Sequence, residues 1–201
     1  MSIGEDIKQA YIDIGAAYTI LRPGGDIEGE YGRFGNFSSG FNGHGAEAEL
    51  PFDTLAVPGD LLRVGSSGNV YLIVASNGET IENEIIRVKA DLIRINVQFS
   101  HFHLIANSRK PDMTPDATWS LLGSDRPGCF MRSISPVKEY MGRVSAGSVG
   151  VNEAAMMIVP DVYGVNTGHR LVVGSMTYMI QEMENTNYTG VAVCALVEDT
   201  R

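Results

Sequence analysis

The sequence predicts a mainly β protein, with two small antiparallel β-barrel or sandwich units, a short N-terminal helix and long loops. Three observations predict this class. Short apolar segments that alternate with polar residues recur along the chain between Gly- and Asn-containing turns. An eight-residue pattern occurs twice, and helical periodicity is clear in the first 15 residues. A chain of 201 residues is long enough for two small domains.

The N-terminal segment has the pattern of a short amphipathic helix. Its apolar residues recur on one helical face: Ile3, Ile7, Ala10, Tyr11 and Ile14. Ser2 and Glu5 have the spacing of a capping box, and Gly15 stands where a helix would end. Residues 16–22 then read as a strand, closed by Pro23 and two glycines.

A glycine-rich stretch follows, from Gly24 to Gly45. Its aromatic residues fall three or four positions apart: Tyr31, Phe34, Phe37 and Phe41. One interpretation is a long loop that these rings pin to the body of the protein. The alternative is an extended arm that docks on a neighbouring subunit.

The β signal is strong in the next segment. Strands are predicted at residues 61–64 and 70–75, with a turn at Asn77-Gly78. Residues 86–92 alternate apolar and charged side chains, as in a half-buried strand. The alternation changes phase at Leu92-Ile93 and continues to Phe99, which indicates a bulge or a sharp bend.

The second half contains a less regular stretch and then further strands. Residues 107–136 hold four prolines and little periodicity, so they predict a connector that Trp119, Leu121 and Leu122 anchor to a core. Residues 152–158 suggest a short helical turn. Strands are predicted at 170–173, 178–181 and 191–197, with a turn at 184–189. The predicted domains are residues 1–106 (helix, glycine-rich loop and first β-unit), 107–157 (connector) and 158–201 (second β-unit).

The two β-units share a sequence pattern. Residues 59–66 (GDLLRVGS) and 168–175 (GHRLVVGS) both fit Gly-x-x-Leu-x-Val-Gly-Ser. Pro51 and Pro160 match at the same offset, and Tyr71 and Tyr178 follow the two copies. We interpret the pattern as an internal repeat of a strand–turn–strand core. Chance similarity between two β-rich stretches is the alternative.

Charge and composition exclude some classes of function. The net charge of −9 repels phosphate backbones and anionic lipid, which argues against general nucleic-acid binding and membrane docking. It is compatible with a channel through which DNA passes without specific binding. There is no secretory signal and no apolar run long enough for a membrane span, so we expect a soluble protein made in a reducing cytoplasm.

The histidine pair in the sequence SHFH is a candidate metal site. His101 and His103 would share one face of a strand, but local spacing supplies no further ligand. Surface or core histidines are the simpler interpretation. A cysteine nucleophile, Cys129 or Cys194, with His101 or His169 as its base was also weighed. Because Cys194 lies in the apolar run VAVCALV, we expect it to be an inert buried thiol.

Two other groupings have simpler explanations than a functional site. The carboxylate pairs Glu47/Glu49 and Glu182/Glu184 would each share a strand face, as solvated residues of an acidic chain do. The glycines Gly40, Gly43 and Gly45 lack the strand and helix that flank a nucleotide-binding loop. The sequence therefore predicts no catalytic, cofactor-binding or metal-binding residues, and a protein that is not an enzyme.

The repeat segments carry a family resemblance. Residues 160–178, from PDVYGV to GHRLVVGSMTY, and residues 188–201, YTGVAVCALVEDTR, resemble neck or head-completion proteins of tailed bacteriophages. Residues 47–62 (EAELPFDTLAVPGDLL) resemble the matching part of a longer variant with two such units. The resemblance covers about half of the chain. The glycine-rich stretch and the segment around Trp119 have no counterpart in it.

The resemblance implies a virion structural protein of the head–tail connector. Such a protein forms a ring with copies of itself, closes the DNA-filled head, and contacts the portal or adaptor on one side and the tail terminator or other tail proteins on the other. The alternatives are a tail terminator or baseplate protein, or a carbohydrate-binding module that uses aromatic residues of the 24–45 stretch.

Overall fold

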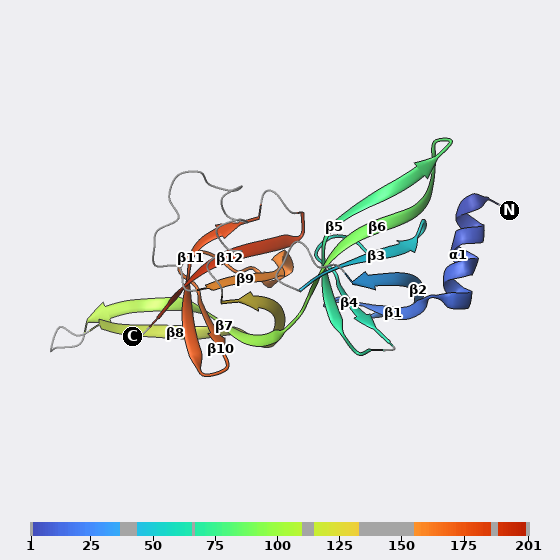
Figure 1. The fold of residues 1–201 in the computed structure, drawn as a ribbon. Coiled ribbons are helices and arrows are strands. Elements are labelled where there is room, and N and C mark those ends of the chain that lie inside the picture. The colour runs from blue at the N-terminus through green and yellow to red at the C-terminus, as the bar shows by residue number, and fades with distance from the viewer. Residues whose placement is uncertain are drawn as a thin grey trace. The chain divides into compact units, whose positions relative to one another are not determined.

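A computed structural model describes residues 2–36, 44–65, 67–109, 115–132, 155–185 and 189–199 of the chain. The chain forms two compact units: Met1–Ile95 with Thr186–Val191, and Asn96–Asn185 with Ala192–Arg201. Each unit contains one closed antiparallel barrel of six strands (Figure 1). The predicted fold class, two small barrels with a short N-terminal helix, is confirmed.

The first unit begins with a helix, as the sequence predicts. Helix α1 spans Ile3–Ile14, and the Ser2 hydroxyl accepts a hydrogen bond from the backbone N–H of Glu5 at 3.3 Å. Gly15 follows the helix with extended backbone and donates its N–H to the carbonyl oxygen of Tyr11. A Cβ at this position would lie 2.5 Å from the same oxygen, so the position favours glycine. Six strands follow: β1 (Ala16–Leu21), β2 (Ile27–Asn36), β3 (Gly45–Pro51), β4 (Leu61–Val64), β5 (Val70–Ile81) and β6 (Glu84–Arg94). They close as barrel 1 in the order β1-β2-β3-β6-β5-β4.

The second unit repeats this arrangement without the helix. Its elements are β7 (Val97–Arg109), β8 (Pro115–Met131), β9 (Ala155–Pro160), the 3-10 helix η1 (Asp161–Tyr163), β10 (Arg170–Val173), β11 (Met176–Glu184) and β12 (Val191–Glu198). Barrel 2 closes in the order β7-β8-β9-β12-β11-β10. Adding six to each strand number of barrel 1 gives the strand order of barrel 2. The two barrels therefore have the same topology.

Strand pairing places the sequence repeat at equivalent positions of the two barrels. Leu62 of β4 pairs with Tyr71, and Leu171 of β10 pairs with Tyr178. Pro51 ends β3 and Pro160 ends β9. Both β5 and β11 carry a bulge directly after an isoleucine that faces the core, Ile73 and Ile180. This agreement in register supports the repeat over chance similarity.

The two cores also correspond position by position. The core cluster of barrel 1 consists of Tyr18, Ile20, Ala48, Leu50, Ala56, Leu62, Ile73, Ala90 and Leu92. Eight of these nine positions have an equivalent in the core cluster of barrel 2, namely Phe99, Met157, Val159, Val165, Leu171, Ile180, Cys194 and Leu196. The ninth position is Ile20, whose equivalent is His101: Ile20 pairs with Leu62, and His101 pairs with Leu171.

The boundary between the units differs from the predicted domains. The second unit begins at Asn96, not after a connector, and β7 and β8 occupy much of the segment 107–136 that was expected to connect the units. Leu121 is 54% exposed and Leu122 is 39% exposed, so neither anchors this segment to a core. The phase change at Leu92-Ile93 lies just before the end of β6 at Arg94. The apolar pattern after it continues in β7, which begins at Val97 and belongs to barrel 2. Residues 133–154 of the predicted connector lie outside the described residues.

Three local predictions are also corrected. Residues 27–36 of the glycine-rich stretch form β2 rather than a loop. The turn between β5 and β6 lies at Glu82-Asn83, which both have positive φ, and not at Asn77-Gly78. Residues 155–158, expected in a helical turn, belong to β9, whose six residues are all buried. Because both faces of β9 are covered, its apolar run lacks the alternation that marks a half-buried strand.

In the portion of the chain that the structure describes, α1 and η1 are both too short to cross a membrane.

Candidate functional site

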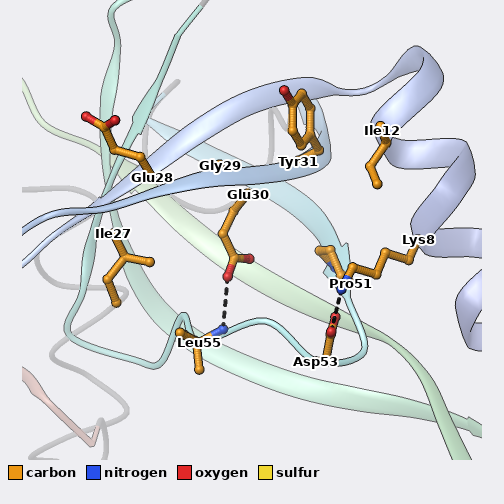
Figure 2. Close-up of a pocket in the computed structure, with 10 residues that line it drawn as sticks. All are labelled: Lys8, Ile12, Ile27, Glu28, Gly29, Glu30, Tyr31, Pro51, Asp53 and Leu55. Atoms are coloured by element: carbon orange, nitrogen blue, oxygen red, sulfur yellow. Dashed lines mark hydrogen bonds and ion pairs between the residues drawn. The ribbon is translucent and has the colours of Figure 1, made fainter.

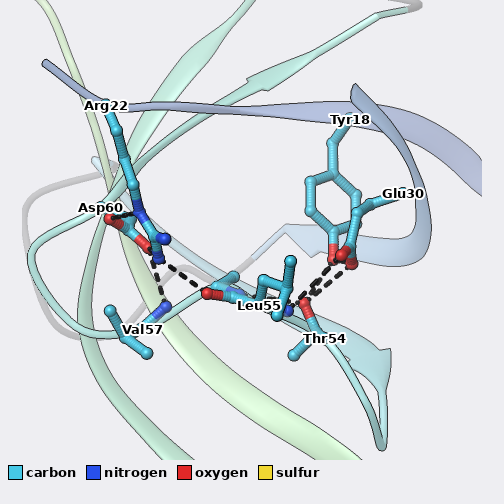
Figure 3. Close-up of polar contacts among 8 residues, drawn as sticks. Tyr18, Arg22, Glu30, Thr54, Leu55, Val57 and Asp60 are labelled. Carbon is cyan, nitrogen blue, oxygen red and sulfur yellow. Dashed lines mark hydrogen bonds and ion pairs between the residues drawn. The ribbon is translucent and has the colours of Figure 1, made fainter. Parts of the chain in front are cut away.

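The connection between β3 and β4, residues 52–60, is fastened to barrel 1 by an ion pair (Figure 3). The Arg22 guanidinium donates to both carboxylate oxygens of Asp60 and to the carbonyl oxygen of Leu55 at 2.7 Å. Asp60 is 8% exposed and also accepts from the backbone N–H of Val57 at 2.9 Å. The connection places Ala56 in the barrel core. These bonds hold the connection on the barrel, with Ala56 in the core and Leu55 and Val57 exposed.

A second set of bonds joins the same connection to β1 and β2 (Figure 3). The Tyr18 hydroxyl donates to a carboxylate oxygen of Glu30 at 2.7 Å and lies 2.9 Å from the hydroxyl of Thr54. The Thr54 hydroxyl donates to the same oxygen of Glu30. Burial raises the pKa of Tyr18, a residue that is 2% exposed. The phenol is therefore a permanent donor, and Glu30 is its acceptor.

Barrel 2 fastens the equivalent β9–β10 connection, residues 161–169, in another way. His101 is fully buried, and its Nε2 lies 2.8 Å from Nδ1 of His169 in this connection. The Arg126 guanidinium lies 2.9 Å from Nδ1 of His101 and donates to the carbonyl oxygen of Tyr163 at 2.8 Å. Val165 of the connection belongs to the core. A buried histidine pair and an arginine thus hold this connection.

The arginine determines which nitrogen of His101 carries the proton. A guanidinium is always a donor, so Nδ1 of His101 accepts from Arg126 and Nε2 carries the hydrogen that it donates to His169. Burial, and then the nearby His169 and Arg126, lower the pKa of His101 to about 4. Burial also lowers the pKa of His169. Both imidazoles are therefore neutral at pH 7.

The spacing in the sequence indicates His101 and His103 as a pair, and the structure places a third histidine, His169, beside them. The ring centroids of His101 and His169 are 4.9 Å apart, and those of His103 and His169 are 6.3 Å apart. Local spacing could not find His169 because it lies 68 residues from His101 and meets it only through the pairing of β7 with β10. Among the residues that the structure describes, no group of three or more His, Cys, Asp or Glu side chains is arranged so that it could hold a metal ion.

Another buried ion pair lies in barrel 2 beside the tryptophan. Arg170 donates to Asp199 at 2.6 Å, and the side chain of Asp199 is 1% exposed. The guanidinium carbon of Arg170 lies 4.1 Å from the centroid of the Trp119 ring. A cation–π contact thereby joins Trp119 to Arg170, the residue that follows His169 in the sequence. Arg170 therefore covers one face of this ring.

The other candidate residues of the sequence do not form a common site. Cys129 and Cys194 are both fully buried in barrel 2, where burial raises the pKa of each thiol to about 12. Glu49 accepts from Arg87 at 2.9 Å, while Glu47 lies opposite Asp91 in the sheet. Glu182 and Glu184 lie on β11, opposite Ala195 and Val193. Gly45 starts β3; Gly40 and Gly43 lie outside the described residues.

The aromatic residues of the glycine-rich stretch do not form one surface. Phe34 packs against the core of barrel 1, with its ring edge-on to Tyr18 and stacked on Tyr71. Tyr31 lines a pocket, and Phe37 and Phe41 lie outside the described residues. The described rings therefore do not support a carbohydrate-binding platform.

The pocket, of about 260 Å³, lies between α1 and barrel 1 (Figure 2). Its lining comes from α1, β2, the end of β3 and the β3–β4 connection: Lys8, Ile12, Ile27, Glu28, Gly29, Glu30, Tyr31, Pro51, Asp53 and Leu55. Lys8 pairs with Asp53, and Glu30 accepts from the backbone N–H of Leu55 at 3.4 Å. Because these polar groups already bind one another, the pocket does not identify a ligand.

A two-stranded arm extends from barrel 2 (Figure 1). It consists of residues 103–109 of β7, which extend past the pairing with β10, and residues 115–126 of β8, which precede the pairing with β9. Residues 103–109 pair with 115–120, and residues 121–126 pair with 99–102 of β7. Four aliphatic side chains on this β7–β8 arm are exposed, between 39% and 61%: Leu104, Ile105, Leu121 and Leu122. Exposed aliphatic side chains on such a ribbon are candidates for contact with other proteins.

Comparison with known proteins does not assign the chain to a family. No family model matches it, and no curated protein matches it. Three solved structures of K. pneumonia MrkH align over 100% of this chain. They are the apo state (8% identity, 85% of that chain, TM-score 0.19), the c-di-GMP complex (8%, 87%, 0.16) and a P2(1) crystal (6%, 85%, 0.23). These TM-scores are too low to support an argument about fold or ligand.

Proposed function

We propose that this chain is a structural subunit of the head–tail connector of a tailed bacteriophage, where it forms or completes a ring that closes the DNA-filled head and docks the tail. The observation that carries the assembly role is the β7–β8 arm. An isolated two-stranded ribbon with four exposed aliphatic side chains is suited to contact another subunit. The placement in the phage neck rests on the resemblance of residues 47–62, 160–178 and 188–201.

The barrels and the charge are compatible with this role. A closed barrel has no free sheet edge, so the arms and connections are left to make contacts between subunits. Residues 1–95 contain 14 acidic and 7 basic residues, a net charge of −7 out of the total of −9. An acidic surface that faces a channel repels DNA and lets it slide. The partners that we propose are copies of this chain, the portal or adaptor, and the tail proteins, in a virion assembled in the host cytoplasm.

The location in the particle is the direct test. Phage particles carrying a tag on the C-terminus of this chain are labelled with gold and imaged by negative-stain electron microscopy. We expect label at the head–tail junction. Label elsewhere on the tail would indicate a tail terminator or baseplate protein instead of a neck protein. If no particle is labelled and the tagged chain is absent from every particle fraction, a role in the virion is overturned.

The assembly surface is tested separately by substitution. We expect Leu121→Asp to reduce incorporation of the tagged chain into particles at least tenfold, because a carboxylate replaces an exposed aliphatic group of the arm. Ile85→Asp, at a 50% exposed isoleucine of β6, is the matched control. Equal incorporation of Leu121→Asp and Ile85→Asp would show that the arm is not the assembly surface.

A further inference from the structure

The two repeated barrels differ chemically at one core position. Barrel 1 has Ile20 there and barrel 2 has His101, and both are fully buried. Asp60, which anchors the β3–β4 connection, has His169 as its equivalent at the repeat offset. The chain has four histidines, and three of them, His101, His103 and His169, lie together in barrel 2.

The bonds of these residues depend on their protonation. Nδ1 of His101 accepts from Arg126, so it has to remain unprotonated for that bond to exist. Nδ1 of His169 accepts from His101, so its protonation would likewise replace an acceptor by a donor. A proton on either nitrogen turns a hydrogen bond into a contact between two donors.

The surrounding groups make a proton more costly. The titratable and charged groups around His101 are Arg126 from β8, His103 from β7, and His169 and Tyr163 from the β9–β10 connection. The structure describes no carboxylate that bonds to the histidine pair. A positive charge on His101 would therefore lie beside a guanidinium in a buried site.

Through these bonds the histidines are coupled to the β9–β10 connection. His169 is part of the connection, and Arg126 holds the Tyr163 carbonyl while its guanidinium lies 5.0 Å from the Tyr163 ring centroid. In barrel 1 the corresponding attachment uses Arg22, Asp60 and Glu30 and contains no histidine. The two barrels should therefore respond differently to mild acid.

We propose that His101, His169 and Arg126 form a proton-sensitive latch, which holds residues 161–169 on barrel 2 while both imidazoles are neutral and releases them when the pair is protonated. The sign follows from linkage. An accessible histidine has a pKa of about 6.5, whereas that of His101 in the closed state is about 4. The open state therefore binds more protons as pH falls from 6.5 towards 4, and opening becomes more favourable over this interval. The latch does not depend on the proposed function.

The test is hydrogen–deuterium exchange of the full chain, read by mass spectrometry between pH 7 and pH 4.5 and corrected for the intrinsic effect of pH on exchange. We expect protection of residues 161–169 to fall by roughly tenfold to a hundredfold over this range. Residues 52–60 of barrel 1 are the internal control and should keep their protection. Strand β12 should also keep its protection, because the latch releases a connection and not the barrel.

Two variants separate the latch from general acid sensitivity. His101→Ile introduces the residue that barrel 1 has at this position. His101→Gln keeps a hydrogen-bond donor and an acceptor, but its amide does not take up a proton between pH 7 and pH 4.5. In both, we expect the acid-induced loss of protection at 161–169 to disappear. His44→Gln, outside the cluster, should behave like the unmodified chain. An unchanged pH dependence in a folded His101 variant would overturn the latch, as would equal loss of protection in β12.

Discussion

His101 in barrel 2 occupies the core position that Ile20 occupies in barrel 1. Each residue pairs across the sheet with the leucine of the repeated Gly-x-x-Leu motif, Leu171 or Leu62, and each is fully buried. The eight other core positions of barrel 1 have equivalents in the apolar core cluster of barrel 2. The exchange of an aliphatic for an imidazole therefore occurs at one defined point of an otherwise shared core.

This exchange goes together with a change at the adjacent strand. Tyr18 pairs with Glu30, and the equivalent Phe99 pairs with Arg126. In barrel 1 a tyrosine hydroxyl and a carboxylate meet at this point, whereas in barrel 2 the hydroxyl is absent and an arginine binds the histidine. The same topology thus uses two sets of polar groups to fasten the same connection.

Replacing Tyr18 by phenylalanine should destabilise barrel 1. The Tyr18→Phe change removes the donor to Glu30 and the contact with Thr54, and we expect a loss of about 1 kcal/mol in the free energy of unfolding. Urea unfolding followed by circular dichroism measures the shift in midpoint. Tyr31→Phe, at the pocket beside α1, is the control. A midpoint unchanged by Tyr18→Phe would mean that water replaces the lost donor at no cost.

Removing the carboxylate of Asp60 should have a larger effect. Asp60→Ala leaves Arg22 without its ion-pair partner and Val57 N–H without its acceptor, and we expect a loss of about 2 kcal/mol. Asp53→Ala breaks the exposed pair with Lys8, whose side chain is 42% exposed, and should cost less than about 1 kcal/mol. Comparison of their urea midpoints measures the difference. Equal midpoints would contradict a structural role for the Asp60 ion pair.

The strand pattern of the sequence predicted most of the barrel strands because each alternates or runs apolar between turns. The repeat aligned β4 with β10 because Leu62 and Leu171 face the two cores at the same register. Strand β8 was missed for a physical reason. It contains Gly123 and Pro127, and its pairing with β7 shifts register three times, so its side chains follow no constant period.

The histidine cluster could be predicted only in part. The i, i+2 spacing of His101 and His103 correctly placed both on one side of a strand, where each faces His169. Neither the burial of His101 nor its bond to His169 follows from local sequence, because both depend on which strands are neighbours in the closed barrel. Arg126 is likewise brought to His101 by the irregular pairing of β7 with β8.

A methyl group at Gly123 should disturb the latch without touching its histidines. A Cβ there would lie 2.2 Å from Nε of Arg126, so Gly123→Ala displaces the guanidinium from His101 and from the Tyr163 carbonyl. Because the charge of Arg126 contributes to the lowered pKa of His101, we expect that pKa to rise above about 4. Titration of the imidazole protons by NMR measures it.

The control for this substitution is Gly78→Ala in β5. A Cβ at Gly78 would make an ordinary contact of 3.4 Å with Ile85, and the residue lies in barrel 1. It should leave the titration of His101 unchanged. If Gly123→Ala also left that titration unchanged, the guanidinium would not be in electrostatic contact with the imidazole.

The two cysteines should be inert in the folded chain. Cys129 and Cys194 have no exposed surface, and burial raises the pKa of each thiol to about 12, so neither forms a thiolate at pH 7.5. We expect both to react with dithiodipyridine at least a thousandfold more slowly than in the guanidinium-unfolded chain, because reaction requires opening of barrel 2. Absorbance of the released thiopyridone measures the rate.

Ser124→Cys supplies the comparison within the same barrel. Ser124 is exposed on the β7–β8 arm, so a thiol there should react at nearly the rate of the unfolded chain. Because all three positions lie in one unit, a difference in rate reports burial rather than the stability of different units. If Cys129 or Cys194 reacted as fast as Ser124→Cys, the core of barrel 2 would be open to reagent. That result would contradict the burial of His101, on which its lowered pKa depends.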